Sequence, residues 1–476
     1  MQPDQETAEV GWKDILSGGH LPRFLLLCFG VWLHAADSTL VATVLPSAVG
    51  DIGGVAYVSW AISLYMLGSI VASAASALLA VTFGLRVAMA GSAALYGVGC
   101  AASALAPDMA TMLLGRLLQG LGGGGMLALS YIGVSQLFPA SLLPRMMAAM
   151  SSVWGVSAFC GPLIGGFFAS LGLWRFGFWA FAAQSLLLAL IVLWVLQSDR
   201  PSADAEKAFV PYRRLALLTG AVLAISAAGA EVSLTGSSLL CLAGLLMLAF
   251  LIWRDGQADV RLFPSRPLDL RHWVGAGTVM TFAFAAATIS FTTYGPLLMQ
   301  LLYGADPLTA GYIVTLESIA WTVAAIAVAG ARPAAERTII RVGSVAITLG
   351  VVGFAITMPD GSLLMLLPWA ALQGAGFGLA WAFIVRRVVA GAPAGEQERA
   401  SSALPTTQHI GYALGAALAG IVANAGGFAD GISPGDAEVV GFWVFAAFLP
   451  LALLGNLAAW CLTREPTRRQ PTLEAA

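Results

Sequence analysis

Charged residues are scarce in this chain, and their scarcity excludes most soluble proteins. Only 10% of the 476 residues are Asp, Glu, Lys or Arg, and 59% are hydrophobic. Soluble globular domains carry about 25% charged residues. The mean hydropathy of +0.84 and repeated long apolar runs instead predict an all-α polytopic membrane protein, whose partner is the lipid bilayer rather than a nucleic acid.

The signatures of several other protein classes are also missing. The five cysteines have no CxxC spacing, so they predict neither a disulfide framework nor a metal site. No HExxH, G-x-S-x-G or nucleotide-binding loop occurs, which argues against an enzyme. The first 20 residues are polar and mildly acidic, so we expect no cleavable signal peptide. We therefore predict a non-enzyme that needs no cofactor and no metal.

Fourteen apolar runs are candidates for membrane-spanning helices. The two shortest, 214–230 and 237–253, are joined by only a few residues and predict a helical hairpin. The remaining twelve are at about 22–46, 57–80, 87–106, 109–136, 146–170, 175–197, 273–302, 309–330, 339–358, 362–389, 400–424 and 439–462.

The charges outside these runs are segregated by sign. All of the 23 lysines and arginines except Arg116 and Arg175 lie near the termini or in alternate loops, whereas the opposite loops are acidic. The positive-inside rule then predicts fourteen crossings with both termini cytoplasmic. The acidic loops contain Asp51, Asp108, Glu231, Asp306, Asp360, Asp430, Asp436 and Glu438.

A repeat divides the chain. The pattern L-Q-G-x-G-x-G begins at Leu118 and again at Leu372, 254 residues later, and Gly161 matches Gly415 at the same offset. Unless this similarity is a chance product of glycine-rich sequence, it indicates two bundles with the same orientation in the membrane. We predict a six-helix bundle (1–197), linkers with a two-helix insert (198–271) and a second six-helix bundle (272–476).

Three formal charges lie well inside the predicted spans, namely Asp37, Arg116 and Glu317. Intramembrane charges are costly, so such residues are functional candidates by default. A carboxylate that gains and loses a proton is the simplest device for coupling to a proton gradient, and we predict that these three residues couple protons. The alternatives are a structural ion pair for Arg116 and a neutral, hydrogen-bonded acid for Glu317.

Polar and aromatic side chains within the spans predict a substrate cavity. His34 is one helical turn before Asp37, where it either tunes the proton or only packs near the cavity mouth. Trp321 is one turn after Glu317 and suits a wall that binds apolar or cationic ligands. Packing against lipid or between helices is the alternative for all of these side chains. The predicted cavity residues are His34, Trp32, Trp154, Tyr294, Trp321, Gln408 and His409.

The apolar run at 146–170 is unusually rich in glycine and contains a proline. In lipid such residues are tolerated where a neighbouring helix packs closely. The second-bundle copy lacks the proline, so we expect a hinge and seal that packs against its counterpart across the interface between bundles. The alternative is an ordinary small-residue packing face. The residues are Gly155, Gly161, Pro162, Gly165 and Gly166.

Four segments together resemble the major facilitator superfamily, and within it the fourteen-helix drug:proton antiporters. The segment 155–166 is similar to the family's antiporter motif. Arg116 opens an R-x-x-Q-G segment that the resemblance assigns to proton coupling, and Asp37 opens a D-x-T-x-V-x-x-x-L-P segment. The segment 174–179 resembles the family's W-R-W-x-F-W entry into span six. One departure is the loop after span two, which keeps only Gly84 and Arg86 of the family's G-x-L-A-D-R-x-G-R-R pattern.

The resemblance implies a proton-coupled secondary transporter of the cytoplasmic (inner) membrane that functions as a monomer. Its expected activity is the export of small organic compounds by alternating access between two bundles. Proton-coupled uptake of a nutrient or siderophore-like solute on the same scaffold is the alternative. A receptor or channel is less compatible with the repeated bundles.

Overall fold

The structure is a computed structural model that describes residues 21–139, 141–197, 210–230, 232–258, 261–428 and 434–464. Every regular element within these ranges is a helix. The first helices are α2 (Leu21–Ile52), the short η1 (Val55–Tyr57), α3 (Val58–Leu105), α4 (Met109–Leu137), α5 (Leu143–Ser170) and α6 (Trp174–Val195). Next come α7 (Tyr212–Ala227), α8 (Leu234–Gly256), α9 (Trp273–Tyr303), α10 (Pro307–Val328) and the short η3 (Pro333–Ala335). The last are α11 (Glu336–Asp360), α12 (Leu363–Gly391), α13 (Gln397–Ala425), α14 (Pro434–Ala446) and α15 (Leu449–Leu462).

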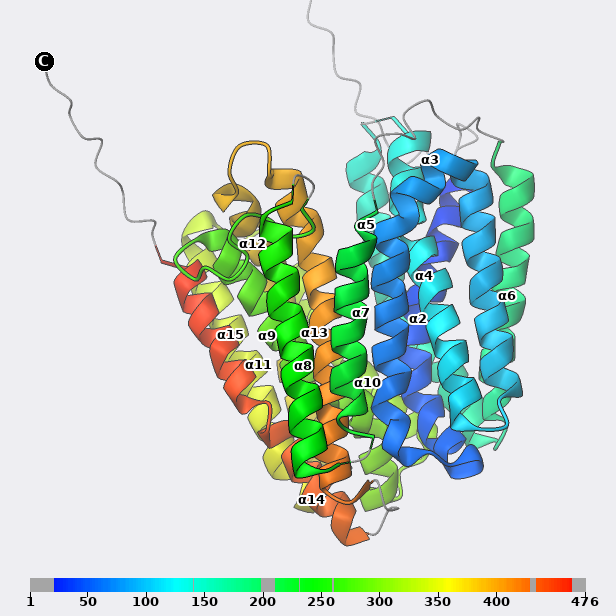
Figure 1. Ribbon diagram of the computed structural model, residues 1–476, viewed down its shortest axis with the longest axis vertical. Helices are drawn as coiled ribbons and strands as arrows, with labels where there is room; N and C mark the ends of the chain where they lie inside the picture. The colour runs from blue at the N-terminus through cyan, green and yellow to red at the C-terminus, as the bar shows by residue number, and fades with distance from the viewer. Residues whose placement is uncertain are drawn as a thin grey trace, which may run out of the picture.

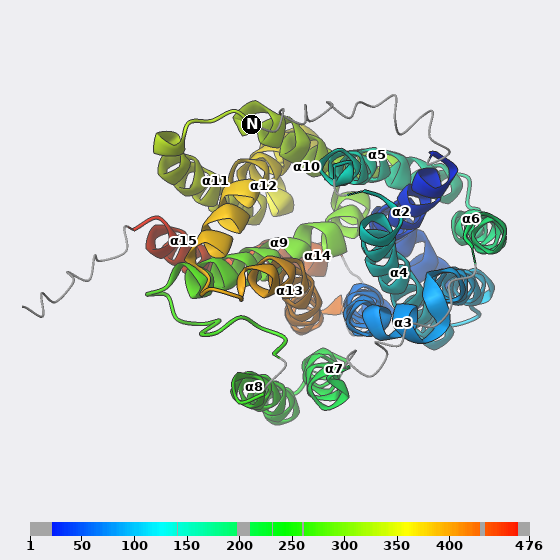
Figure 2. The same ribbon diagram turned by 90° about the horizontal axis from the view of Figure 1, so that it is seen from above.

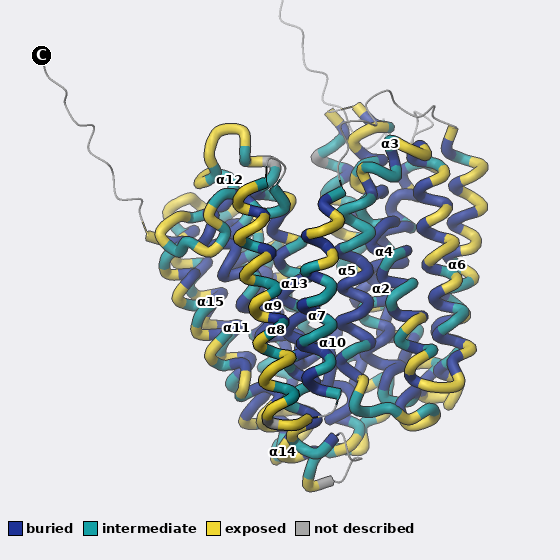
Figure 3. Tube along the Cα trace, in the orientation of Figure 1, coloured by how far each residue is buried: buried dark blue, intermediate teal, exposed yellow. Residues whose placement is uncertain are grey.

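The helices form two groups that lie side by side (Figure 1). Helices α2 to α6 pack against one another as the first group, and α9 to α15 form the second group. Helices α7 and α8 pair with each other outside both groups, where α7 contacts α3 and α13 (Figure 2). Buried residues concentrate where helices meet, and exposed residues lie on the outward faces (Figure 3). Many of the exposed residues are apolar, and Trp194 is one of them. An apolar exterior of this extent is typical of a membrane protein.

Eleven helical segments among the described residues are long and apolar enough to cross a membrane. One of them contains α3, which has 48 residues and bends at Gly84, where φ is +77°. Glycine accepts this left-handed conformation without steric cost, so one continuous element accounts for two predicted spans. Helices α7 and α13 are not among the eleven. The all-α, multi-pass architecture predicted from the sequence is confirmed.

The last predicted span, 439–462, is broken into α14 and α15. Pro450 stands in the first turn of α15 and has no backbone N–H, so it cannot continue the hydrogen-bond ladder of the preceding helix. Pro450 is the signal for this break within the apolar run, and the prediction of one span at 439–462 did not use it.

The two ends of the helix groups differ in charge. Asp51 lies at the end of α2, and Asp108 and Asp306 cap the first turns of α4 and α10, so we call this side the aspartate end. Arg86 follows the bend of α3 and Arg145 lies in the first turn of α5 at the opposite side, the arginine end. The segregation of charge in sequence is therefore also a segregation in space.

Two equivalent seams join the helix groups, one between α5 and α10 and one between α13 and α3. In the first seam, Thr315 donates a hydrogen bond to the carbonyl oxygen of Ala158 (3.2 Å). In the second, Ser63 donates to the carbonyl oxygen of Ala413 (3.0 Å). This pairing of corresponding helices agrees with the repeat seen in the sequence.

Helix α7 is fastened to the second seam through one side chain. The amide nitrogen of Asn424, on α13, donates to the carbonyl oxygens of Gly229 (2.5 Å) and Ala56 (2.8 Å). Gly229 directly follows α7, and Ala56 belongs to η1 beside α3. The amide therefore connects the α7–α8 pair with both helix groups.

Candidate functional site

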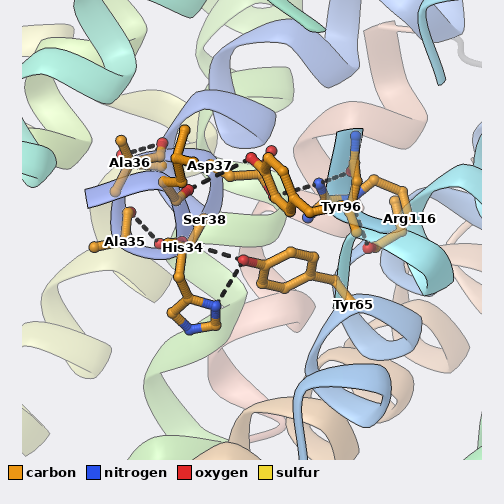
Figure 4. Close-up of polar contacts among 12 residues, drawn as sticks. His34, Ala35, Ala36, Asp37, Ser38, Tyr65, Tyr96 and Arg116 are labelled. Atoms are coloured by element: carbon orange, nitrogen blue, oxygen red, sulfur yellow. Dashed lines mark hydrogen bonds and ion pairs between the residues drawn. The ribbon is translucent and has the colours of Figure 1, made fainter. Parts of the chain in front are cut away.

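Two of the three intramembrane charges form a buried ion pair within the first helix group (Figure 4). The Oδ2 atom of Asp37, on α2, lies 2.7 Å from Nη1 of Arg116, on α4, and neither residue is exposed to solvent. An unpaired charge in this environment would be strongly destabilising. The two residues are 79 positions apart and link α2 to α4.

Arg116 is held by three further contacts. It donates to the side-chain oxygen of Gln119, one helical turn later on the same face of α4. Its Nε donates to the carbonyl oxygen of Ala61 (3.2 Å), and its guanidinium lies 4.3 Å from the ring centre of Tyr65. A guanidinium over an aromatic face is attracted by the ring quadrupole. The cation is therefore fixed in place even apart from Asp37.

Tyr65 connects His34 to this ion pair. Its hydroxyl lies 2.9 Å from Nδ1 of His34 and 3.1 Å from the carbonyl oxygen of the same residue. Within the described part of the chain, no hydrogen bond joins His34 directly to Asp37, although they are one turn apart. Tyr65 therefore contacts both His34 and the ion pair.

Two polar atoms beside the ion pair have no hydrogen-bond partner among the described residues. They are Oδ1 of Asp37 and Nε2 of Gln119. Buried polar atoms are nearly always paired, so each unpaired atom calls for an explanation. A carboxylate oxygen without a hydrogen-bond partner is an available acceptor for a proton.

The third charge, Glu317, forms a separate site in the second helix group. It lies on α10, and Gln373 of α12 donates to its Oε1 (3.1 Å). The position that matches Arg116 in the repeat is Ala370, so the corresponding cation is missing here. Glu317 has an amide partner where Asp37 has a guanidinium.

Glycines bring the helices together in both sites. A Cβ atom added to Gly120 would collide with the backbone of Tyr65, and one added to Gly374 would collide with the backbone of Glu317. Small residues of this kind allow the close backbone approach that membrane helices favour. The repeated L-Q-G segments therefore bring α4 close to α3 and α12 close to α10 in the same way.

Three of the seven predicted cavity residues gather between the two helix groups, and a fourth, Gln408, is next to one of them in the sequence. The ring of His34 is 5.9 Å from that of Trp154, on α5, and 6.1 Å from that of His409, on α13. Gln408 is next to His409 and donates to the hydroxyl of Tyr412 (3.2 Å). Helices from both groups thus contribute polar side chains to one central cluster.

The other three predicted cavity residues lie elsewhere. Trp32 donates to Gln184 of α6 (3.0 Å) and lines a different cavity, between α2 and α5. Tyr294 is fully buried, with its ring 6.3 Å from that of Phe428. Trp321 stacks on Phe377 of α12, with ring centres 4.9 Å apart. Among the described residues, the seven therefore fall into separate groups, because the apolar spans carry no signal for which face turns inward.

The predicted glycine motif makes close contacts, but not with its counterpart α13. Cβ atoms added to Gly161 and Gly165 would collide with Thr39 and Thr43 of α2. A Cβ atom on Gly166 would lie 2.8 Å from Cα of Leu308, on α10. Gly155 faces Thr322 of α10 at 3.6 Å, and a Cβ atom on Gly311 of α10 would lie 3.0 Å from Pro162. The motif seals α5 against α2 within its own group and against α10 across the seam.

Two residues of these sites, Tyr65 and Gln373, were not among the predicted functional residues. Tyr65 was only one of many aromatic residues within spans, and nothing local distinguishes it. Gln373 had a usable signal, because it repeats Gln119 at the offset of 254 residues. Among the residues that the structure describes, no group of three or more His, Cys, Asp or Glu side chains is arranged to hold a metal ion.

Comparison with known proteins agrees with this architecture. The Major Facilitator Superfamily model matches residues 27–367. A transporter of Mycobacterium tuberculosis, named as a probable multidrug-efflux transporter, is 32% identical over 97% of this chain and 99% of its own length. The efflux pump bfoC of Aspergillus brasiliensis is 27% identical over 60% of this chain and 53% of its own.

Solved structures show the same fold at low sequence identity. A D-xylose–proton symporter has a TM-score of 0.64 at 16% identity and covers 93% of this chain and 97% of its own. A peptide transporter in complex with alafosfalin has a TM-score of 0.65 at 16% identity, with coverages of 93% and 95%. The chain belongs to the major facilitator superfamily and is a multi-pass membrane transporter, not an enzyme.

Proposed function

We propose that this protein exports small organic compounds in exchange for protons, as a monomeric drug:proton antiporter of the fourteen-helix type in the cytoplasmic membrane. The name of the M. tuberculosis relative supports efflux. The observation that supports proton coupling is the presence of two intramembrane carboxylates in different helix groups, Asp37 fully buried and Glu317 partly buried. Asp37 is neutralised by Arg116, whereas Glu317 has only an amide partner.

The fourteen crossings follow from counting α3 twice and α14–α15 once. Helices α7 and α13 each contribute one crossing. With the arginine end cytoplasmic, both termini are on the cytoplasmic side. The bundles are then 1–197 and 272–476, separated by the insert region 198–271. Residues 198–209 and both chain ends lie outside the described residues.

The contacts between the helix groups favour a conformation that is open to the cytoplasm. The hydrogen bonds of Thr315 and Ser63 across the seams, and the ring contact of Phe159 with Tyr312 (5.6 Å), involve the middle or the aspartate-end portions of their helices. In the proposed orientation this end faces outward. Alternating access then requires these contacts to break while new contacts form at the arginine end.

Protonation of Asp37 is one switch in this scheme. Arginine stays charged in proteins, so a proton on Asp37 converts a neutral pair into a net positive one. Arg116 keeps its contacts with Gln119, Ala61 and Tyr65. The attraction between α2 and α4 therefore weakens while α4 remains intact, which allows α2 to move.

Glu317 is the second switch. Its carboxylate lacks a cation among the described residues, so a proton or a polar group of the substrate can compete for it. A proton that enters from outside would neutralise Glu317 and release the substrate. Loss of that proton to the cytoplasm would restore the binding-competent state. The inward movement of a proton in exchange for the outward movement of the substrate is antiport.

Proton flux in inside-out membrane vesicles tests the proposal. With a preset acidic interior, addition of a transported compound should collapse the pH gradient while the compound accumulates inside. Asp37→Asn and Glu317→Gln should each abolish this collapse, and Asp269→Asn, a change in the loop before α9, should not. Gradient collapse at the wild-type level in the Asp37→Asn, Glu317→Gln double variant would refute both assignments. Efflux of preloaded compound together with protons would indicate uptake instead.

A further inference from the structure

A cavity of about 470 Å³ separates α2 from α5 at the arginine end. It is distinct from the central cluster around His34. Its walls are almost entirely apolar. It is lined by Leu25, Cys28, Phe29 and Trp32 of α2 and by Ala148, Ala149, Ser152, Val153 and Val156 of α5.

The cavity exists because the two helices pack closely at one end only. Toward the aspartate end, Gly161 and Gly165 bring α5 against Thr39 and Thr43 of α2. Toward the arginine end, the α5 residues that line the cavity include two alanines and a serine, whose side chains are too short to fill the gap. The result is a groove that widens toward the arginine end.

This α2–α5 groove faces the bilayer rather than the second helix group. Leu25 and Val156, one on each wall, are both 56% exposed. Leu25 is nine residues before His34 and therefore lies on the side of α2 opposite the central cluster, whereas Gly155 and Phe159 of α5 meet α10 nearer the aspartate end. Figure 2 shows α5 and α6 at the edge of the first helix group, with α2 running inward between them. From Leu25 to Trp32 the groove extends about 10 Å along the helix, enough for part of one acyl chain.

A cation lies at the wide end of the α2–α5 groove. Arg145 is three residues before Ala148 and seven before Ser152, so it shares their face of α5. It has no acidic partner among the described residues, and no carboxylate lines the groove. We propose that the α2–α5 groove binds an anionic phospholipid of the cytoplasmic leaflet, with one acyl chain between the helices and the phosphate against Arg145. The proposal depends on the proposed function only for the assignment of the leaflet.

The two helices that form the α2–α5 groove also carry residues of the candidate functional site. Helix α2 carries His34 and Asp37 and α5 carries Trp154, all within a few turns of the groove. An acyl chain between these helices holds them apart at the arginine end and prevents the groove from collapsing. The conformation of α2 is therefore sensitive to the lipid that occupies the groove.

Native mass spectrometry of the full-length protein tests the proposal with phosphatidylglycerol and phosphatidylcholine as probes. The wild type should retain phosphatidylglycerol in preference to phosphatidylcholine. Arg145→Gln should bind phosphatidylglycerol about fivefold more weakly, the effect of losing one basic contact with an anionic headgroup. Ser152→Trp should lower the binding of both lipids because it fills the groove. Arg254→Gln, at the arginine end of α8, is the matched control and should bind as the wild type does.

Equal loss in Arg145→Gln and Arg254→Gln would overturn the proposal in favour of unspecific surface attraction. Unchanged binding in both Arg145→Gln and Ser152→Trp would also overturn it. A brominated phosphatidylglycerol gives an independent measurement, since it should quench the fluorescence of the wild type more than that of Trp32→Phe. Equal quenching would place the lipid elsewhere. Neither measurement uses transport, so failure here is distinguishable from failure of the proposed antiport.

Discussion

Glu317 occupies in the second helix group the position that Tyr65 occupies in the first. Gly374 lies against the backbone of Glu317 as Gly120 lies against the backbone of Tyr65, and a glutamine precedes each glycine. The same helix contact thus presents a neutral aromatic ring beside a paired arginine in one group and a carboxylate in the other. The same glycine-mediated helix contact therefore holds different side chains in the two helix groups.

Removal of the charge on Asp37 should affect stability as well as transport. Asp37→Asn leaves the buried guanidinium of Arg116 without a counter-charge, and breaking such a pair typically costs about 3–5 kcal/mol. Thermal unfolding in detergent should show this loss. The double variant with Arg116→Gln should recover part of the stability but no proton-coupled flux. A single variant as stable as the wild type would mean that the pair is not electrostatically important.

Glu317→Gln should separate transport from folding. The glutamine can still accept the hydrogen bond from Gln373, so we expect a stability change below about 1 kcal/mol. Proton-coupled flux should nevertheless fall to background, because the new side chain cannot take up a proton. Retained pH-gradient collapse would remove Glu317 from the coupling mechanism.

Glycine substitutions should distinguish close helix contacts from open positions. Gly374→Ala places a methyl group against the backbone of Glu317, and overpacking of this kind costs about 1–3 kcal/mol. Gly91, on α3, has no atom within 4 Å of an added Cβ. Gly91→Ala should be neutral or stabilising by up to about 1 kcal/mol. Similar melting temperatures for the two variants would contradict the packing shown here.

Acid should weaken the start of α10. The hydroxyl of Thr309 and the backbone N–H groups of Thr309 and Leu308 donate to Asp306, outside the membrane span, and hold the pKa of its carboxyl below its usual value. Because the folded-state pKa is the lower one, the cap stabilises fully above about pH 4 and is lost as pH falls through the folded-state pKa.

Hydrogen exchange in the first turn of α10 at neutral and acidic pH measures this effect. Asp306→Ala should speed exchange at neutral pH, since loss of such a cap costs about 1 kcal/mol. Asp306→Asn should keep the cap and lose its dependence on pH. An acid response that persists in Asp306→Asn would point to another titrating group.

Much of the fold was accessible from the sequence because apolar run length and charge segregation are direct consequences of the bilayer. The need of Arg116 for a partner followed from the cost of a buried charge. That the partner of Arg116 is Asp37 could not be predicted without knowing which spans are neighbours in space. The close contact made by Gly161 was predictable in kind, whereas its neighbour α2 was not.

The arrangement of the aromatic residues was the least predictable part. A soluble helix reveals its buried face because apolar residues recur at every third or fourth position. A membrane helix is apolar on all sides, so this signal is missing. Trp32, Tyr294 and Trp154 therefore looked equivalent in sequence, although they face α6, Ser59 of α3 across the contact between the helix groups, and the central cluster respectively. The break before α15 is a different case, because Pro450 marks it in the sequence.

The two hydrogen bonds of Asn424 have a mechanical consequence for the α7–α8 pair. The amide group of Asn424, on α13, donates to Gly229 after α7 and also to Ala56 of η1, which precedes α3 in the first helix group. Any rocking of one group relative to the other must stretch at least one of these bonds. The α7–α8 pair is therefore connected to both helix groups at this end, so a rocking motion of the groups would also displace α7.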